Sequence, residues 1–485
     1  MSVIKRNLSW ILFAQAATWG VSIVLLIVAP RRLGGEELGR LFFAAAYVAL
    51  FEIVALFGTA TYLQKVIARD PSSLGRYVFN SLVLKLAITA TLVAVAVGLA
   101  IVVGYPRETV QLIAVCCISM VFNTLNSCLA GGLFGWQQMA RPALWDTVRS
   151  YAAGALGVAV LMHGGSALQY ALVSNLVCGV PFVANLIYLW PALKANRTIR
   201  PDLWKEVLRG GFPFFILAAL LVLYGTIDVP LLEAFTGSET VGWYLLAYRW
   251  VSLPAFFAAS VASAFFPALS AEPGELSANF RRMANQALHL VVLVATPGAV
   301  GIALIAGKFI HLLYGAEFHQ SVPLMQILAL HIPIVGVDIV LGSVIAAADR
   351  QRQWVYVSVA AAVLNPMLNM AAIPATDHLF SNGAIGAAVI TALTEVLLLV
   401  GALRLRPAGV LDRATTRTLL RVVAASLTMV PVVLVLSPAP VGVQVVAGMV
   451  TYGLASLALG TVSFGEVRSW ISGLRSRRSQ QPVIP

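Results

Sequence analysis

The sequence predicts an all-α polytopic membrane protein with about fourteen transmembrane helices. The first observation is composition, since 60% of the 485 residues are apolar and only 11% are charged, which gives a mean hydropathy of +0.88. The second is spacing, because apolar runs near the length of about 20 residues that spans a bilayer recur from end to end. The runs are about twice as long as a transmembrane strand and lack strict alternation, so they favour helices over a barrel.

The apolar runs define the predicted spans in chain order. The segment 143–163 is interrupted by Asp146 and Arg149. An even number of spans places both termini on one side of the membrane. The predicted spans cover residues 8–29, 41–63, 78–104, 110–134, 143–163, 169–190, 211–234, 242–268, 286–306, 322–347, 355–375, 384–403, 417–437 and 440–461.

The distribution of the basic residues predicts on which side of the membrane the termini lie. If the N-terminus is cytoplasmic, 26 of the 32 Lys and Arg residues fall in or beside interior segments, as the positive-inside rule requires. This distribution predicts a multi-pass protein of the plasma membrane with both termini in the cytoplasm. It also explains the net charge of +12, so the charge does not indicate a nucleic-acid-binding protein. The basic residues are scattered over short connections and attract anionic lipid. The exterior segments keep Arg31, Arg32, Arg40, Arg107 and Lys308, and Arg249 lies within a span.

Motifs for enzymatic chemistry are missing from the sequence. It contains no GxxxxGK[ST] phosphate loop, no HExxH, no nucleophile elbow and no GxGxxG after a strand, and it has no exterior loop large enough to hold a catalytic domain. We therefore expect no enzyme, no cofactor and no metal site. The four cysteines, all within predicted spans, are expected to be packing residues; they are Cys116, Cys117, Cys128 and Cys178.

An internal repeat predicts two lobes. The segment 34–44 (GGEELGRLFFA) aligns without gaps on 237–247 (GSETVGWYLLA), at an offset of 203 residues. The offset corresponds to six helices, an even number, so the copies have the same orientation, as in a parallel repeat. We predict an N-terminal six-helix lobe at 1–200, a C-terminal six-helix lobe at 201–405, two extra helices at 406–463 and a basic cytoplasmic tail at 464–485. A central cleft between pseudo-symmetric lobes is expected.

Several stretches together resemble a known family. They are the glycine-rich turn 33–39, the string from Ile227 to Arg249, the FPALS stretch 266–270 and the LYGAEF stretch 313–318. In this order, they are similar to the Wzx-type oligosaccharide flippases of polysaccharide biosynthesis. That family belongs to the multidrug/oligosaccharidyl-lipid/polysaccharide exporter superfamily, which also contains the MATE antiporters and the lipid II flippase. The resemblance covers roughly residues 1–405.

The resemblance implies that a polyprenyl-diphosphate-linked oligosaccharide is moved from the cytoplasmic to the exterior leaflet by alternating access, for O-antigen, capsule or exopolysaccharide assembly. It implies membrane lipids as partners, and a polysaccharide polymerase and glycosyltransferases as further ones. A diphosphate and a sugar cannot cross hydrocarbon unaided, so fixed positive charge and amide groups should line the path. The candidate substrate-binding residues are Arg31, Arg32, Arg249, Asn123, Asn126, Asn175 and Asn365, with Asn369 as a further amide.

Acidic residues within spans are candidates for ion coupling. Asp228 and Arg249 lie at matched depth, about 9 to 11 Å below the exterior surface, so we expect them to pair. The pair is either a structural salt bridge or a site that opens to bind a proton or sodium ion. Glu52 and Glu395 have no evident partner in the sequence and are further candidates. For Lys85 and Asp338, nearer the cytoplasmic ends, snorkelling or solvated packing is expected.

Three alternatives stay open. A cation-coupled MATE-type multidrug antiporter would need a net acidic cleft, whereas the three arginines favour an anionic cargo. A lipid II flippase would use the last two helices for a lipid tail. A membrane-embedded glycan ligase or polymerase would need an acid/base pair in an exterior pocket.

Overall fold

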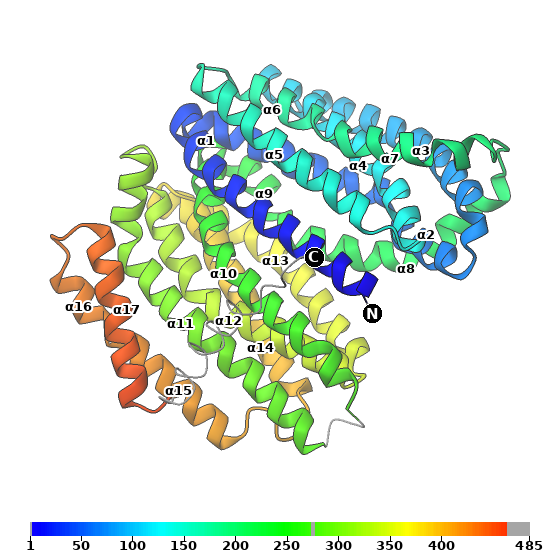
Figure 1. Ribbon diagram of the computed structural model, residues 1–485. Helices are drawn as coiled ribbons and strands as arrows, with labels where there is room; N and C mark the ends of the chain where they lie inside the picture. Colours follow the sequence, from blue (N-terminus) through cyan, green and yellow to red (C-terminus); the bar gives the residue numbers. More distant parts are fainter. Residues whose placement is uncertain (1, 273–276, 463–485) are drawn as a thin grey trace, which may run out of the picture. The chain divides into compact units, whose positions relative to one another are not determined.

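The computed structural model describes residues 2–272 and 277–462, and all regular structure in these ranges is helical (Figure 1). The predicted basic tail at 464–485 lies outside the described residues. The helices are α1 (Ser2–Leu56), α2 (Thr59–Arg69), the 3-10 turn η1 (Pro71–Ser73), α3 (Leu74–Val103), α4 (Arg107–Gly135), α5 (Ala140–Met162), α6 (Ala167–Leu176), α7 (Gly179–Lys194), α8 (Pro201–Thr226), α9 (Asp228–Thr236), α10 (Ser238–Ser270), α11 (Ala278–Tyr314), α12 (Ser321–Ala347), α13 (Gln351–Phe380), α14 (Ala384–Leu405), α15 (Arg413–Leu427), α16 (Met429–Val435) and α17 (Val441–Ala458).

Each of the predicted spans is helical, which confirms the all-α fold class. Twelve segments of the described chain are long and apolar enough to cross a membrane. The first of them, Ile23–Arg69, contains parts of two predicted spans, and α5, with its internal charges, is not among the twelve. The chain is therefore a multi-pass membrane protein.

Glycine forms the turn between the first two predicted spans. α1 is two helices joined at Gly34, whose φ of 74° and ψ of 176° are not helical. Gly237, its counterpart in the repeat, has a φ of 84° and a ψ of 177° and separates α9 from α10. A positive φ of this kind is accessible to glycine and strained for other residues. The two copies of the repeat thus share a backbone conformation as well as a sequence pattern.

Prolines break three of the predicted spans. Pro181, Pro230 and Pro431 each occupy the third position of a short second helix, namely α7, α9 and α16. A proline ring lacks an N–H and clashes with the carbonyl group four residues earlier, which favours a break before it, although α11 and α12 continue through Pro297 and Pro333. The helices α6, α8 and α15 accordingly end shortly before these prolines. As a result, Asp228 is the first residue of a new helix, at the break in the seventh predicted span.

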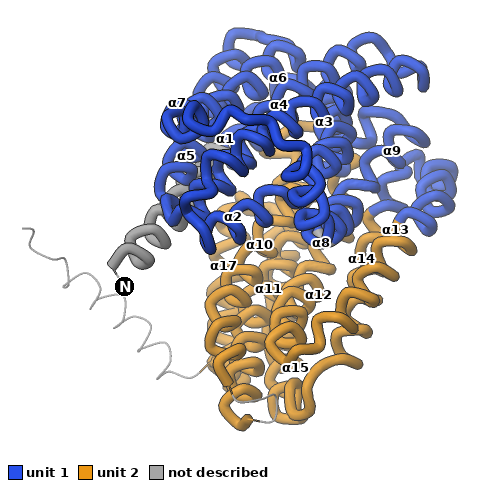
Figure 2. Tube along the Cα trace, turned by 90° about the vertical axis from the view of Figure 1, so that its right-hand side faces the viewer, with its two compact units in different colours: residues 1–246, 366–387 blue, residues 247–365, 388–485 orange. Residues whose placement is uncertain are grey.

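The residue contacts divide the chain into two units, coloured separately in Figure 2. Unit 1 contains residues 1–246 and 366–387, and unit 2 contains residues 247–365 and 388–485. Within unit 1, α1 packs against α4, α5 and α8, and α2 packs against α4 and α8. A buried apolar cluster that includes Leu63, Leu129 and Leu189 joins α2, α4 and α7. The predicted lobe boundaries at 200 and 405 stay a prediction.

Within unit 2, α11 packs against several helices. It packs against α12, α15, α16 and α17, and Val292, Leu293 and Val422 form a buried cluster between α11 and α15. Figure 1 shows α16 and α17 side by side, as their contacts require. The last two predicted spans, α15–α16 and α17, thus belong to unit 2 and pack against its helix α11.

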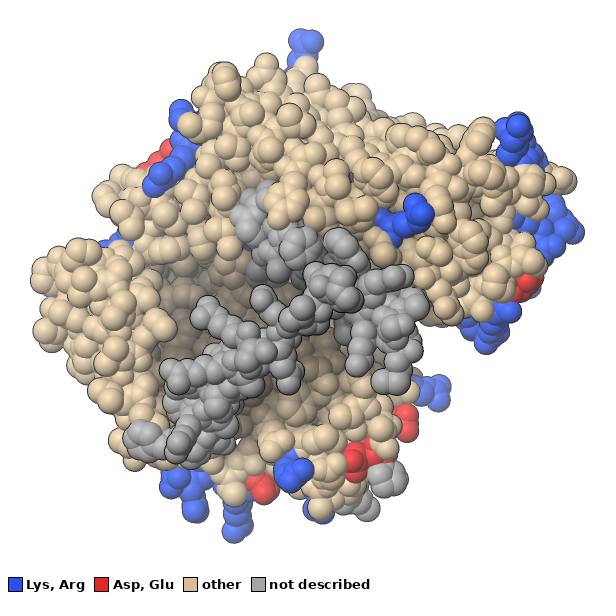
Figure 3. Space-filling view, viewed as in Figure 1, with Lys and Arg blue, Asp and Glu red and all other residues tan. Residues whose placement is uncertain are grey.

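Charged side chains are sparse on the surface drawn in Figure 3, where most of the area belongs to uncharged residues. Exposed apolar side chains such as Val102, Ile187 and Leu221 fit a surface in contact with lipid. The four cysteines are buried and free, in agreement with the packing role predicted for them.

Candidate functional site

A polar cluster lies among the helices of unit 1, around Glu52 of α1. Nδ2 of Asn123, on α4, donates a hydrogen bond of 3.2 Å to Oε1 of Glu52. The guanidinium group of Arg149, on α5, lies close enough to Glu52 to interact with it electrostatically. Glu52, for which the sequence offered no partner, therefore has two neighbours from two other helices.

Arg149 extends this cluster on α5. Its Nε lies 3.6 Å from Oδ1 of Asp146, and its Nη1 lies 3.9 Å from Sγ of Cys178. The side chains of Arg149 and Asp146 are 35% and 52% exposed, although Arg149 lies about 13 Å along α5 from its first residue. Charged groups at such a depth face water or other polar groups rather than hydrocarbon. This face of unit 1 is thus suited to a hydrated path.

Asn126 and Asn175 make different kinds of contact within unit 1. Oδ1 of Asn126 accepts a hydrogen bond of 2.9 Å from Nδ2 of Asn185, which is 1% exposed. Nδ2 of Asn175 donates to the carbonyl oxygen of Ala171, one turn earlier, at 2.7 Å. The bond between Asn126 and Asn185 joins α4 to α7 and is of the kind typical of interhelical packing in membranes, whereas the bond of Asn175 stays within α6. A role for these two asparagines in sugar binding stays a prediction.

Asp228 is the centre of a second polar cluster in unit 1. Its side chain is 8% exposed. Oδ2 accepts a hydrogen bond of 3.0 Å from the hydroxyl group of Tyr244, on α10, and Oδ1 accepts one of 2.8 Å from Nδ2 of Asn369, on α13. The carboxylate also begins α9, where the positive end of the helix dipole favours a negative charge. The predicted pairing with Arg249 stays a prediction.

The three predicted arginines are all exposed. Arg31 and Arg32 lie just before the Gly34 turn, and Nη2 of Arg32 lies 3.5 Å from Sδ of Met162, at the end of α5. Arg249 is on the part of α10 that belongs to unit 2. Arg31 and Arg32 are thus exposed at a turn of unit 1, whereas the side chain of Arg149, in the middle of α5, is 35% exposed.

Unit 2 contains a pair of buried carboxyl groups. Asp338, on α12, and Glu395, on α14, are 5% and 8% exposed, and the two carboxyl groups lie within interaction distance of each other. Next to Glu395 along α14, Oγ1 of Thr394 accepts a hydrogen bond of 3.4 Å from Nδ2 of Asn365, on α13. Two adjacent carboxylates repel each other in a low-dielectric interior, and a shared proton converts the repulsion into a hydrogen bond. The arrangement can therefore hold a proton or a small cation.

The expectation of solvated positions for Lys85 and Asp338 was wrong. Lys85 is 0% exposed, and its Nζ donates hydrogen bonds of 2.5 Å and 2.9 Å to the carbonyl oxygens of Ala55 and Leu56. These carbonyls have no helical partner because α1 ends at Leu56 and Gly58 has a positive φ. Lys85 thus closes a helix end from the inside, and Asp338 faces Glu395.

An apolar groove lies between α11 and the helices α16 and α17. It has a volume of about 420 Å³, and Pro297, Gly301, Met429, Val433 and Tyr452 are among the residues that line it. A Cβ added at Gly301 would have Cε of Met429 as its nearest neighbour, at 3.7 Å. The groove can accommodate a hydrocarbon chain.

Arg149, Asp146 and Tyr244 were missed as candidate site residues. The interruption of the span 143–163 by two charges was the signal for Arg149 and Asp146, because charges within a span need a polar surrounding. Tyr244 carried no such signal, since a tyrosine beside apolar residues is common in any membrane helix. Asn369 was predicted only as an amide donor, and its bond to Asp228 spans 141 residues of sequence.

Two family models match the chain. The model of the polysaccharide biosynthesis proteins matches residues 4–271, and the MatE model matches residues 213–371. The chain is 22% identical to the probable low-salt glycan biosynthesis flippase Agl15 of Haloferax volcanii over 383 residues, 77% of each chain. It is 23% identical to the probable flippase AglR of the same organism over 466 residues, 91% of this chain and 93% of that one.

Two kinds of solved transporter have the same fold. The lipid II flippase MurJ in an inward closed conformation superposes with a TM-score of 0.76 at 16% identity, over 92% of this chain and 98% of that one. An inward-facing multidrug resistance MATE transporter superposes with a TM-score of 0.60 at 16% identity, over 80% of this chain and 93% of that one. The predicted fold type is therefore confirmed.

Proposed function

The chain belongs to the family of polysaccharide biosynthesis proteins, and from that premise we propose that it is a flippase for a polyprenyl-diphosphate-linked oligosaccharide. The lipid-linked glycan would move from the cytoplasmic to the exterior leaflet of the plasma membrane by alternating access, with both termini of the protein in the cytoplasm. The names of the two Haloferax volcanii relatives support this class of cargo. O-antigen, capsule and exopolysaccharide precursors all have this chemistry.

The observation that carries the proposal is the half-exposed cluster of Arg149, Asp146, Glu52 and Asn123 within the helices of unit 1. A diphosphate needs a fixed cation, and a guanidinium group binds phosphate oxygens through two parallel hydrogen bonds. Asp146 pairs with Arg149 when no cargo is present, so the cation does not have to remain unpaired in a medium of low dielectric, and the second acid, Glu52, would take up a proton when the diphosphate binds. The amide group of Asn123 would bind sugar hydroxyls.

Energy coupling is proposed for two acidic sites. Asp228, held by Tyr244 and Asn369 at the start of α9, would bind a sodium ion or proton in unit 1. The Asp338–Glu395 pair would exchange a proton in unit 2. No catalytic step is assigned to these residues. Glycosyltransferases would supply the lipid-linked glycan on the cytoplasmic side, and a polysaccharide polymerase would consume it on the exterior side.

The apolar groove between α11, α16 and α17 would receive part of the polyprenyl chain. Its lining is largely aliphatic and aromatic carbon, and its polar groups, the amide of Gln444 and the hydroxyl of Tyr452, donate hydrogen bonds to backbone carbonyls. An isoprenoid needs only such a surface, because its hydrocarbon has no polar group to satisfy.

The proposal is tested with Arg149→Gln in cells that depend on this protein for a surface glycan. The variant keeps hydrogen-bond donors and loses the charge, so we expect surface glycan to fall at least roughly tenfold while its lipid-linked precursor accumulates in the cytoplasmic leaflet. Arg197→Gln is the matched control, because Arg197 is exposed in the connection after α7. Normal export by Arg149→Gln would remove this cluster from the cargo path.

Arg249→Ala and Asp228→Asn, separately and together, test the predicted pair in the same assay. Loss of export in each single variant with recovery in the double variant indicates a structural salt bridge. Loss in all three indicates that both residues act on cargo or coupling ion. Wild-type export in all three would remove both residues from the proposed site.

The match of the MatE model to residues 213–371 favours a cation-coupled multidrug antiporter as the second candidate function. That function predicts export of organic cations and no effect on surface glycan. Accumulation of a cationic dye in cells with and without the protein distinguishes the two, because a flippase for an anionic lipid should leave dye levels unchanged.

A further inference from the structure

The apolar groove of unit 2 continues into a second pocket near the end of α11. This end pocket has a volume of about 550 Å³, and Lys308, His311, Pro438 and Pro440 are among the residues that line it. Groove and end pocket lie on one face of α11, because their lining residues follow one another at the spacing of a single helical face. In chain order, these residues are Val294, Gly298, Gly301, Ile305, Lys308 and Leu312.

The opposite wall, on α17, shows the same continuity. Val441 lines the end pocket, and Val445 and Met449 line the groove, again on one helical face. At 1.5 Å per residue, the path along α11 from Val294 to Lys308 is about 21 Å long. That length exceeds half of the hydrocarbon core of a bilayer, which is about 30 Å thick. One lipid molecule can therefore place its chain in the groove and its polar head in the end pocket.

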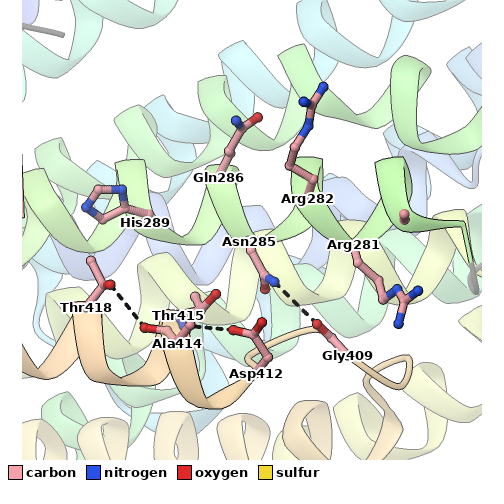
Figure 4. Close-up of a pocket in the computed structure, with 11 residues that line it drawn as sticks. Arg281, Arg282, Asn285, Gln286, His289, Gly409, Asp412, Ala414, Thr415 and Thr418 are labelled. Atoms are coloured by element: carbon pink, nitrogen blue, oxygen red, sulfur yellow. Dashed lines mark hydrogen bonds between the residues drawn. The ribbon is translucent and has the colours of Figure 1, made fainter. Parts of the chain in front are cut away.

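A buried apolar contact bounds the groove at its other end. Leu293 and Val422 belong to one buried cluster between α11 and α15, and Tyr452 packs against it. Beyond this cluster lies a separate polar pocket of about 590 Å³, where Figure 4 shows Arg282 of α11 and Asp412, the residue that caps α15. The groove thus opens toward a polar site at the end of α11 rather than at its start.

The end pocket contains a cation that is held in place. Nζ of Lys308 donates hydrogen bonds to the carbonyl oxygen of Ser437 and, at 2.8 Å, to that of Ala439, in the turn between α16 and α17. An ammonium group has three N–H donors, so one donor and the positive charge remain for a ligand. Among the described residues, no carboxylate forms an ion pair with Lys308, and none of those that line the end pocket is acidic.

The turn beside Lys308 presents few acceptors that would repel an anion. Nε2 of Gln444 donates to the carbonyl oxygens of Leu436 and Ser437 at 2.8 and 3.3 Å, and Lys308 occupies the same turn from the other side. α17 begins directly after Pro440 without a side-chain cap, so the N–H groups of its first turn have no helical acceptor. The positive end of the α17 dipole adds to the charge of Lys308. Charge and donors both favour an anionic headgroup.

We propose that the end pocket binds the phosphate group of the polyprenyl lipid once it has reached the exterior leaflet, while the adjoining isoprene units lie in the groove. This inference rests on the proposed function, whose topology places Lys308 at the exterior end of α11. Lys308 would bind a phosphate oxygen through its remaining N–H, and the ring of His311 and the first turn of α17 would donate to other oxygens. The helices after the repeat would thus retain the translocated lipid.

The test measures binding to the purified protein, so it does not require transport. Delipidated protein in neutral detergent is titrated with farnesyl diphosphate, a short polyprenyl diphosphate, and bound ligand is counted by native mass spectrometry. Farnesol has the same hydrocarbon without the diphosphate and reports on the groove alone. We expect Lys308→Gln to weaken the binding of farnesyl diphosphate about tenfold and to leave that of farnesol unchanged.

Two further variants make the test specific to this site. Gly301→Leu places a side chain in the groove, where Cε of Met429 would be 3.7 Å from its Cβ, so both ligands should lose affinity. Arg282→Gln is the matched control, because it also removes one positive charge from α11 but lies at the polar pocket of Figure 4. It should change neither affinity. An equal loss in Arg282→Gln and Lys308→Gln would overturn the proposal, since net charge would then explain the attraction.

The two ligands also separate a headgroup site from a structural effect. If Lys308→Gln weakens farnesol as much as farnesyl diphosphate, Lys308 only shapes the groove through its bonds to the turn, and the headgroup assignment is wrong. Binding of phosphatidylglycerol as tight as that of farnesyl diphosphate would overturn the assignment to a polyprenyl lipid.

Comparison with the glycan export assay distinguishes this inference from the proposed function. Binding of farnesyl diphosphate that depends on Lys308, in a protein that exports no glycan, would contradict the proposed function alone. Normal glycan export by the wild type, without an effect of Lys308→Gln on binding, would contradict this inference alone.

Discussion

Gly39 and Gly242 lie back to back in unit 1 although 203 residues separate them in the sequence. A Cβ at Gly39 would lie 1.6 Å from the carbonyl oxygen of Ser238, and one at Gly242 would lie 2.3 Å from that of Gly35. The two glycines occupy the same place in the two copies of the repeat. The copies therefore share a conformation and also pack against each other, backbone to backbone, at the turns that begin the second helix of each copy.

Gly39→Ala should destabilise the protein, because the added methyl group meets backbone and no side chain can rotate away. We expect a cost of about 1 to 3 kcal/mol or more, seen as a lower melting temperature of the purified protein in detergent. Gly98→Ala is the control, since Gly98 lies inside α3 with nothing within 4 Å of its Cβ position. That variant should gain about 0.5 to 1 kcal/mol from helix propensity. Equal stability of Gly39→Ala and wild type would contradict the close contact.

The sequence predicted the helices and the repeat because both have local signals. Apolar runs of membrane length identify the spans without reference to any neighbour, and two glycine-rich turns at a fixed offset identify the copies. The contact between Gly39 and Gly242 had no such signal. A glycine required by a close approach looks the same in a sequence as a glycine required by a turn.

Lys85→Met should destabilise unit 1, because it leaves the carbonyl oxygen of Ala55 buried without its donor and that of Leu56 with the hydroxyl group of Thr59 alone. Methionine has a similar length, so the change removes the ammonium group and little packing. We expect a cost of about 1 to 3 kcal/mol in thermal unfolding of the purified protein. Lys65→Met, at an exposed position of α2, should leave the melting temperature unchanged. The same loss in both variants would mean that charge, rather than the helix end, explains the effect.

The polar sites were less predictable than the fold. Asp228 could be recognised as a site residue because a carboxylate in an apolar run needs a partner. The charged residue at matched depth on the next helix is Arg249, so Arg249 was the predicted partner. The hydrogen-bond partners in unit 1 are Tyr244, on that next helix, and Asn369, from a helix four spans later in the chain. Tertiary packing brought Asn369 to Asp228, and no sequence spacing encodes that approach.

Tyr244→Phe tests this arrangement by removing one donor to the carboxylate and keeping the ring. A hydrogen bond to a charged group contributes about 1.5 to 3 kcal/mol, so we expect a lower melting temperature. If Asp228 binds the coupling ion, the variant should also change the sodium or pH dependence of glycan export. Tyr356→Phe is the control, because Tyr356 is 71% exposed. A Tyr244→Phe protein with wild-type stability and wild-type ion response would remove Tyr244 from the site.

Variants of Asp338 and Glu395 distinguish a role of the pair in ion coupling from a role in packing. Asp338→Asn and Glu395→Gln each replace one carboxyl group by an amide that still donates to the remaining carboxyl, so both variants should fold. The exchangeable proton of the pair is lost in each variant. We therefore expect export to fall by roughly tenfold in both single variants, with melting temperatures close to that of the wild type.

A double replacement by leucine decides between the two roles. Apolar residues of similar volume often replace a buried charged pair without loss of stability, so Asp338→Leu with Glu395→Leu should give a folded protein. If the pair only packs α12 against α14, this protein exports glycan normally. If the pair carries a proton or cation during each cycle, the protein is stable and inactive. Normal export by the double leucine variant would therefore refute the coupling role, whereas loss of folding would show that the carboxyl groups are required for structure.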